Sequence, residues 1–351
     1  MSKSLLDNNY NAAEIEILEG LEPVRHRPGM YIGGIDNNAL HHLAIEIIDN
    51  SMDEVVAKHA TVIDVKLSDD NILTISDNGR GIPIDSHPKF KNKSALEVIM
   101  TTLHSGGKFS NKNYATSGGL HGVGASVVNA LSSFMKVDVI RKGILYTQEF
   151  SKGLPTTKLN KVESTNKTTG TSISFKPDTS IFGENNLLNP DKLFKILEYK
   201  AYLFGGVQIN WQCEASLLKG NTITPNTKKF RYINGIIEYI QFKTSTIPMF
   251  TSSTFHGKVK IEDETVEWVI AWLAHDQPSF IETFCNTVPT PLGGSHELGF
   301  RHALTKGIRN FADIKGFKKA NELIYDDLIN STGSILSIFI KNPQFQGQTK
   351  E

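Results

Sequence analysis

The sequence predicts a mixed protein of helices and strands arranged in two domains. Apolar residues recur with the 3.6-residue period of helices in some segments and with the two-residue period of strands in others. The chain has 351 residues, more than a single hydrophobic core usually accommodates. A polar stretch at 217–230, "LLKGNTITPNTKKF", interrupts the pattern, so we expect a first domain over 15–225 and a second over 226–351.

Composition and charge exclude several classes of protein. Hydrophobic residues make up 39% and charged residues 21% of the chain, as in ordinary globular proteins. Lysine plus arginine and aspartate plus glutamate both number 37, so no overall basic charge attracts nucleic acid or an anionic membrane, although a local basic patch is still allowed. Cys213 and Cys285 are far apart, which argues against a zinc site and a disulfide framework.

The N-terminal residues 1–14 are polar and contain no signal-peptide core, so we expect a loose arm there. The longest apolar runs, such as "ILSIFI", are too short to span a bilayer. These two observations predict a cytoplasmic protein.

The elements of the first domain follow in order. We expect a helix over 39–58, two strands at "TVIDVKLS" and "NILTISD", and a second helix over 94–103. The next segment, "SGGKFSNKNYATSGG", is too long and too polar for a tight connection, which predicts either a disordered loop or a functional lid. A helix over 123–131, strands at "MKVDVIR", "LYTQEF" and "GTSISFKP", and a helix over 190–203 complete the domain.

In the second domain, strand-like runs frame one amphipathic helix. The runs are "EWVIAWLA", "SFIETFCNTV" and "SILSIFIKN". The helix places Phe300, Leu304, Ile308 and Phe311 on one face.

The glycine-rich stretch "YATSGGLHGVGASVVNAL", residues 114–131, predicts a site where the backbone approaches an anion. Its order of glycines, G-x-x-G-x-G at Gly119, Gly122 and Gly124, is neither the dinucleotide-binding fingerprint nor a Walker A loop. Glycines still allow backbone N–H groups to approach a phosphate, and the helix that follows offers its N-terminal donors. The alternative interpretation is a glycine-rich surface turn.

The helix at 39–58 carries a polar stripe made of His42, Glu46, Asn50 and Asp53. A solvated face is the usual explanation of such a stripe. This one, however, holds no lysine and no arginine, only groups suited to bind a metal or move a proton. Asn50 offers an oxygen ligand for Mg²⁺, and Glu46 can accept a proton from an attacking water with His42 placed to tune it.

The sequence "ISDNGRGIP" predicts a strand that ends at Asp77, followed by Gly79 and Gly81. Asp-Asn-Gly is commonly only a turn. A carboxylate beside glycines at a strand end can also accept a hydrogen bond from an adenine amino group in an apolar pocket.

Together, "EIIDN", "DNGRGIP", "SGGLHGVG" and "GTSISF" resemble the four motifs of the GHKL ATPases, in the order of that family. The segments "GLEPVRHRPGMYIG", "LHSGGKFSNKNY" and "SGGLHGVGASVVNALS" are similar to the B subunits of bacterial type II topoisomerases. "GGKFSNKNY" and "FCNTVPTPLGGSHELGFRHAL" resemble the topoisomerase IV branch more than the gyrase branch.

The resemblance implies an α+β fold. The first domain would be a Bergerat two-layer sandwich, with helices on one face of a mixed sheet. The second would be a transducer domain of the ribosomal-protein S5 domain 2 type.

The resemblance also implies the roles of individual residues. Glu46 would be the general base with His42 in support, Asn50 the Mg²⁺ ligand, and Asp77 the acceptor of the adenine amino group with Thr171 helping through water. Lys350 would reach the γ-phosphate from the second domain, beside Gln348. The full set of implied ATP contacts is Tyr10, Asn50, Asp53, Asp77, Arg80, Gly81, Ile82, Pro83, Lys108, Tyr114, Gly118, Gly119, Leu120, His121, Gly122, Val123, Gly124, Arg141, Thr171, Gln348 and Lys350.

At the level of function, the resemblance implies an ATP-driven dimer clamp that powers DNA strand passage together with the A subunit of topoisomerase IV. Aminocoumarin inhibitors would compete with ATP at the rim formed by Arg80, Pro83 and Arg141. No segment corresponds to the metal-binding TOPRIM domain of a full B subunit, so we expect a fragment with ATPase activity only. The alternatives are the B subunit of gyrase, another GHKL branch such as a kinase, and a protein without nucleotide binding.

Overall fold

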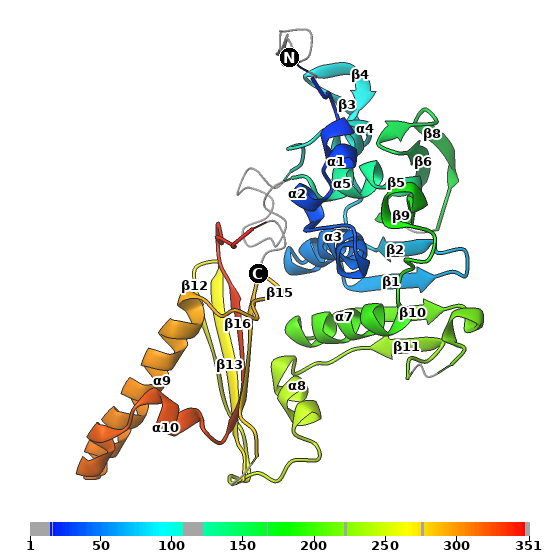
Figure 1. Cartoon of the computed structure of the whole chain (residues 1–351). Coiled ribbons are helices and arrows are strands. Elements are labelled where there is room, and N and C mark those ends of the chain that lie inside the picture. The colour runs from blue at the N-terminus through cyan, green and yellow to red at the C-terminus, as the bar shows by residue number, and fades with distance from the viewer. Residues whose placement is uncertain are drawn as a thin grey trace, which may run out of the picture.

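The computed structural model describes residues 15, 17–107, 122–166, 168–220, 223–274 and 277–347. Two separate sheets organise this part of the chain, as Figure 1 shows. The large sheet has nine strands in the order β11-β10-β1-β2-β9-β5-β6-β7, with β8 beside β6, and the small sheet has five in the order β12-β13-β16-β14-β15. The predicted α+β class is confirmed.

The large sheet is mixed, as expected. Its strands are β1 Val62–Leu67, β2 Leu73–Asp77, β5 Ser132–Arg141, β6 Ile144–Ser151, β7 Leu154–Pro155, β8 Asn160–Ser164, β9 Gly170–Pro177, β10 Gln208–Cys213 and β11 Thr227–Phe230. β1 and β10 are parallel, with Ile63 opposite Ile209, and the other pairs are antiparallel. Burial alternates along β5, because one face of the sheet is covered and the other faces solvent.

Helices cover the buried face of the large sheet. They are α1 Glu22–His26, α2 Gly29–Ile32, α3 Asn37–Val56, α4 Ala95–Thr101, α5 Gly124–Ala130, α6 Thr179–Phe182 and α7 Pro190–Leu203, with a 3-10 turn η2 at Ala215–Leu218. The Asp36 side chain accepts a hydrogen bond from the Ala39 N–H and so defines the start of α3. Asn189 caps α7 in the same way, and a proline follows at the first helical position. A short hairpin of β3 Ser86–His87 and β4 Phe90–Ser94 precedes α4.

The small sheet is sandwiched between two helices. Its strands are β12 Phe255–Ile261, β13 Glu264–Trp272, β14 Phe280–Cys285, β15 Val288–Pro289 and β16 Thr332–Phe339. The helices of this part are α8 Ile236–Lys243, α9 Ser295–Ile314 and α10 Tyr325–Ile329, with a 3-10 turn η3 at Lys318–Glu322. Ile335 packs in the cluster on the α8 side and Leu336 in the cluster on the α9 side, so successive residues of β16 face opposite helices (Figure 1).

The predicted amphipathic helix forms as α9, but its apolar face is only partly covered. Phe300 packs against the cluster that contains Leu336. Phe311 is 60% exposed, and Ala312 is the buried residue of the helix. The expected stripe is therefore covered at Phe300, half-buried at Leu304 and Ile308, and exposed at Phe311.

The connection between the sheets begins later than the proposed domain division at residue 226. β11 still pairs with β10 of the large sheet, so the chain leaves that sheet after Phe230. α7 belongs to both parts, because Leu203 and Tyr199 at its C-terminal end pack in the core of the small sheet. This helix is the main bridge between the two cores.

Candidate nucleotide site

The polar stripe of α3 lies at the side of the helix rather than on a fully solvated face. Leu43, Ile47 and other apolar residues of α3 are buried on the inner side and fix its rotation. His42, Glu46 and Asn50 are partly exposed, and Asp53 is only 4% exposed. The four predicted residues therefore follow one edge of the helix, and three of them, His42, Glu46 and Asn50, keep some exposed surface there.

Glu46 lies directly against the start of α5. A Cβ atom added at Gly124 would come within 2.1 Å of the Glu46 Oε2 atom, closer than any side chain tolerates. The glycine thus allows the carboxylate to approach the first turn of α5. Gly122, with φ of +62°, turns the chain just before this helix, and its carbonyl accepts a hydrogen bond from the Ser105 N–H at 3.1 Å.

Asp77 ends β2 inside a shell of hydrogen-bond donors. The Ser51 hydroxyl donates to Oδ2 and the Gly79 N–H donates to Oδ1, both at 2.9 Å. Crowding by protein atoms removes most of the hydration of this carboxyl group, and this raises its pKa to about 6 despite the two donors, with Glu54 adding a smaller repulsion. Thr171 faces Asp77 across the β2–β9 ladder, so the predicted adenine pair does meet.

The loop after Asp77 forms one wall of the site through close backbone packing. Gly81 has φ of +75°, and a Cβ there would lie 2.7 Å from the Ile140 carbonyl oxygen. The Arg141 guanidinium donates to the Gly81 carbonyl at 3.1 Å, and the Ile82 N–H donates to the Thr171 hydroxyl at 3.3 Å. Pro83 is exposed beyond this wall. The ends of β2, β5 and β9 therefore assemble around one loop.

Two residues of this wall are absent from the sequence prediction. Glu54 binds Arg80 through both carboxylate oxygens, with the Arg80 Nη2 atom 2.7 Å from Oε1 and the Nε atom 3.2 Å from Oε2. Glu54 also accepts a hydrogen bond from the Arg80 backbone N–H. The second missed residue is Ser51. Glu54 lies four residues after Asn50 in α3, and this spacing could have placed it near the polar stripe. Its partner Arg80 lies 26 residues further along the chain, so the sequence did not reveal the pair.

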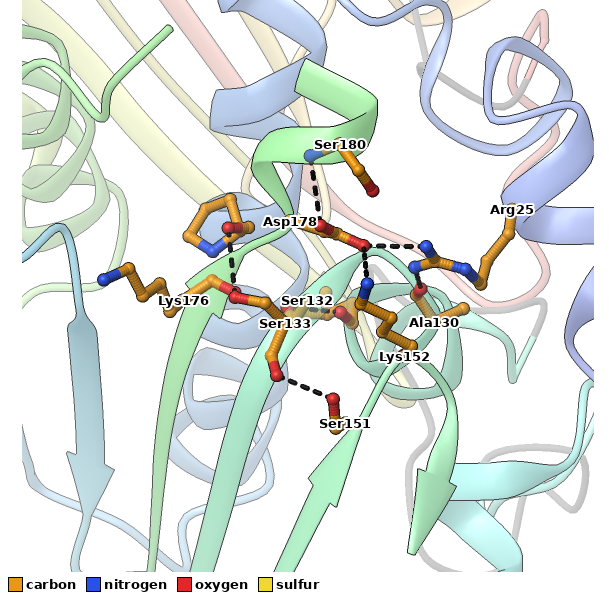
Figure 2. Close-up of polar contacts among 11 residues, drawn as sticks. Arg25, Ala130, Ser132, Ser133, Ser151, Lys152, Lys176, Asp178 and Ser180 are labelled. Atoms are coloured by element: carbon orange, nitrogen blue, oxygen red, sulfur yellow. Dashed lines mark hydrogen bonds and ion pairs between the residues drawn. The ribbon is translucent and has the colours of Figure 1, made fainter. Parts of the chain in front are cut away.

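The far end of α5 is clamped by an arginine, shown in Figure 2. The Arg25 Nη1 atom donates to the Ala130 carbonyl and the Nη2 atom to Asp178, both at 2.7 Å. A cation at the C-terminal end of a helix is favourable because it complements the exposed carbonyls. Burial opposes ionisation of Asp178, but hydrogen bonds from Arg25 and Ser180 outweigh it and lower the pKa of this carboxyl. Arg25 thus holds the C-terminal end of α5, the helix whose N-terminal end lies at the site.

Several predicted site residues lie outside the described part of the chain. These are Tyr10, Lys108, Tyr114, Gly118, Gly119, Leu120, His121, Gln348 and Lys350. Of the described ones, Asp77, Arg80, Gly81, Ile82, Arg141 and Thr171 lie around one loop, with Pro83 at its edge. Glu46 lies against the segment of Gly122, Val123 and Gly124, and His42, Asn50 and Asp53 lie on the same helix as Glu46. Their functional roles stay predictions.

The donor set of α3 fits Mg²⁺. Asn50 and the neighbouring carboxylates offer oxygen atoms, which this ion prefers, and the ion usually takes only one or two of them from a protein beside phosphate and water. Within the described ranges, no group of three or more His, Cys, Asp and Glu side chains forms a cage for a metal ion. Among the described helices, none has the length and hydropathy needed to traverse a membrane.

Comparison with known proteins identifies the family. The model of the histidine kinase-, DNA gyrase B- and HSP90-like ATPases matches residues 35–181, and the DNA gyrase B model matches residues 235–351. The 43K ATPase domain of Thermus thermophilus gyrase B, solved with an aminocoumarin, has a TM-score of 0.77 and 35% identity over 93% of this chain and 82% of its own. The chain belongs to the DNA gyrase B family of ATPases. The ATP-binding domain of topoisomerase IV from Francisella tularensis, solved with a small-molecule inhibitor, has a TM-score of 0.76 and 32% identity over 95% of this chain and 86% of its own.

Within the DNA gyrase B family, the level of identity favours one branch. The B subunit of DNA topoisomerase 4 from Rickettsia bellii is 50% identical over 99% of this chain and 52% of its own length. Its counterpart from Caulobacter vibrioides is 50% identical over 97% of this chain and 50% of its own. The B subunit of DNA gyrase from Thermotoga maritima is 39% identical over 97% of this chain and 53% of its own. The predicted relationship to the B subunit of topoisomerase IV is confirmed, and the chain spans about half the length of these relatives.

Proposed function

We propose that this chain binds and hydrolyses ATP as the ATPase portion of a topoisomerase IV B subunit. The observation that carries the proposal is the arrangement around α3. An adenine-type acceptor, Asp77, lies at one end of the site and a carboxylate, Glu46, lies at the first turn of α5. In this proposal Asp77 serves the base of the nucleotide and Glu46 serves its terminal phosphate.

Recognition of the base rests on Asp77. The carboxylate accepts the adenine amino group, while Thr171 beside it positions a water between the strands. The donors Ser51 and Gly79 hold both oxygens of the carboxylate and so fix its plane. A buried polar acceptor of this kind rejects ligands that lack the amino group, because its own hydrogen bond is then left unmade.

Hydrolysis rests on Glu46 and on the N-terminal end of α5. Phosphoryl transfer needs an oriented water and stabilisation of charge more than covalent help. Glu46 accepts the proton of the attacking water, and the backbone of 122–124 together with the predicted loop residues surrounds the phosphates. Asn50 would hold Mg²⁺, which would supply positive charge against the phosphates when bound. Lys350 and Gln348 complete the site from the second domain.

Two substitutions separate rate from affinity. Glu46→Gln is expected to bind ATP with nearly normal affinity in calorimetry. Its rate of phosphate release should fall to a small fraction of the wild-type rate, since the attacking water loses its base. Asp77→Asn is expected to weaken binding itself. Glu163→Gln, on the exposed strand β8, serves as the control and should change neither quantity. Wild-type hydrolysis by the Glu46 variant would contradict the assignment of the base.

In the whole protein, we propose that ATP binding closes a homodimer that passes one DNA duplex through another, with the A subunit of topoisomerase IV cleaving the DNA in the bacterial cytoplasm. The B subunit of gyrase is the second candidate. Reconstitution of the full-length protein with each kind of A subunit decides between them, because decatenation without supercoiling is expected here. Aminocoumarins should compete with ATP at Arg80 and Arg141.

A further inference from the structure

A lysine connects the two domains from the inside of the protein. Lys200 on α7 has no exposed surface, and its Nζ atom lies 2.6 Å from the Asp49 Oδ1 atom on α3. The same Nζ donates to the Thr287 carbonyl at 2.7 Å and lies 3.3 Å from the Thr287 hydroxyl. Thr287 belongs to the turn between β14 and β15 of the small sheet. Three acceptors from two domains thus surround one ammonium group.

Stability alone does not explain this arrangement. Moving a lysine and an aspartate out of water is costly, and apolar residues of similar volume at such a pair are often equally stable. Asp49 is only 3% exposed, so neither partner keeps its hydration. What the pair does provide is directional contact, because a saturated ammonium fixes the position of each acceptor.

Each end of this contact leads to a part of the proposed ATP site. Asp49 immediately precedes Asn50 in α3 and lies three residues after Glu46, so its position fixes the turn that carries both. At the other end, Asn286 and Thr287 both have positive φ, +48° and +66°, and a β-branched residue in this region is strained. Asn286 exchanges two hydrogen bonds with Ile340, at 3.0 and 2.9 Å. Ile340 follows β16 and leads towards 348–350.

We infer that Lys200 is a positioning residue for hydrolysis, which couples the turn of α3 that carries Glu46 and Asn50 to the strained turn of the second domain. The inference rests on the proposed function, since it assumes that α3 performs the hydrolytic step. Lys200 touches neither nucleotide nor water in this scheme. It holds the turn of α3 that carries Glu46 and Asn50 in a fixed position relative to the β14–β15 turn, whose Asn286 is hydrogen-bonded to Ile340 just after β16.

The test uses the full chain with Lys200→Met and with the double variant D49N/K200M. The double variant removes both buried charges and so avoids an unpaired carboxylate. We expect both variants to lose at least tenfold in ATP turnover, with KM for ATP and affinity for ADP changed less than threefold. Lys243→Met is the matched control, because it removes an ion pair to Glu282 that lies wholly within the second domain. It should keep wild-type turnover.

A second readout does not depend on ATPase activity. Spin labels introduced by E163C and K260C, both at exposed positions, report the distance between the two domains by double electron–electron resonance. Without nucleotide, D49N/K200M should give a clearly broader distance distribution than the wild type or K243M. Wild-type turnover and an unbroadened distribution in the double variant would overturn the inference. Absence of hydrolysis in the wild type would refute the proposed function instead, and the distances would still decide the coupling.

Discussion

At the scale of single residues, Asp77 has a consequence for pH dependence. Burial raises its pKa from an ordinary value of 3.8 to about 6, so the unliganded site takes up a proton near pH 6. A protonated carboxyl group is a poor acceptor for the adenine amino group. Binding therefore competes with protonation, and affinity should fall by up to about tenfold for each pH unit below about 6.

Adenosine is the suitable ligand for this prediction, since phosphates of ATP titrate in the same range. Chemical-shift titrations between pH 5 and pH 8 should give a Kd that is constant above about pH 7 and rises below pH 6.

The raised pKa of Asp77 also makes the stability of the unliganded protein depend on pH. The folded state binds the proton more tightly than the unfolded state, so stability falls as pH rises through about 6. Asp77→Asn should remove that decrease in thermal melts, and a retained decrease would argue against the assigned group.

Motifs that are local in the sequence, together with the family resemblance, single out Asp77, Glu46 and Asn50, whose roles stay predictions. The sequence could not predict Ser51, Glu54 or Lys200. Each of these three acts through a partner that is distant in the chain: Asp77 and Arg80 lie 26 residues away, and Thr287 lies 87 residues from Lys200. Such pairs depend on packing that no local pattern records.

At the scale of elements, most of the helices and strands that were predicted begin and end close to their expected positions. α3 starts at Asn37 rather than at residue 39, since Asp36 supplies the cap, and it ends at Val56 rather than at residue 58. α7 and β9 have the predicted bounds, 190–203 and 170–177. The sequence did not predict every element, and β10 and β11 are among those it missed. β10 finds its partner, β1, 146 residues back in the chain through long-range parallel pairing.

The contact between α3 and α5 predicts the effect of Gly124→Ala. The added methyl group would overlap the Glu46 Oε2 atom, which lies at the end of a flexible side chain and can move away. We expect hydrolysis to fall by at least tenfold while the melting temperature changes little. Gly299→Ala on α9 is the control, because nothing lies within 4 Å of its added Cβ. It should stabilise the helix by about 0.5–1 kcal/mol and leave hydrolysis intact.

The clamp behind α5 predicts a loss of stability for Arg25→Ala. The change removes two hydrogen bonds and leaves Asp178, 4% exposed at its side chain, with the Ser180 N–H and with the weaker ion-pair partner Lys152 at 3.6 Å. We expect a loss of about 2–3 kcal/mol in the free energy of unfolding. Arg27→Ala, at an exposed neighbouring position, should cost little.

The pKa of Asp178 is lowered, so the stabilisation is complete above its ordinary value of 3.8. It is lost as the pH falls through the lowered pKa. In urea denaturation, the difference in free energy between the wild type and the variant should therefore shrink in acid to the part contributed by the hydrogen bond to the Ala130 carbonyl. A difference that stays constant after Asp178 has taken up its proton would rule out the ion pair as the cause.

At the scale of the whole molecule, α7 joins two separate cores. The position of one domain relative to the other therefore depends on the contacts that α7 makes with both. We propose that closure depends also on a second copy of the chain. Deletion of residues 1–14 should leave ADP binding unchanged and abolish the dimer that a non-hydrolysable ATP analogue induces. Sedimentation velocity measures this directly, and full dimerisation of the shortened chain would exclude a role for the arm.

The parallel pairing of β1 with β10 also sets the timing of folding during synthesis. Ile63 pairs with Ile209, so 146 further residues must be made after β1 before its partner strand exists. At a synthesis rate of about 5–20 residues per second, this takes roughly 7–30 s. During that interval one side of β1 has unpaired N–H and C=O groups, which can pair with the strand of another nascent chain. Ribosomes that follow one another closely on a message should therefore increase aggregation of this protein, and slower initiation should decrease it.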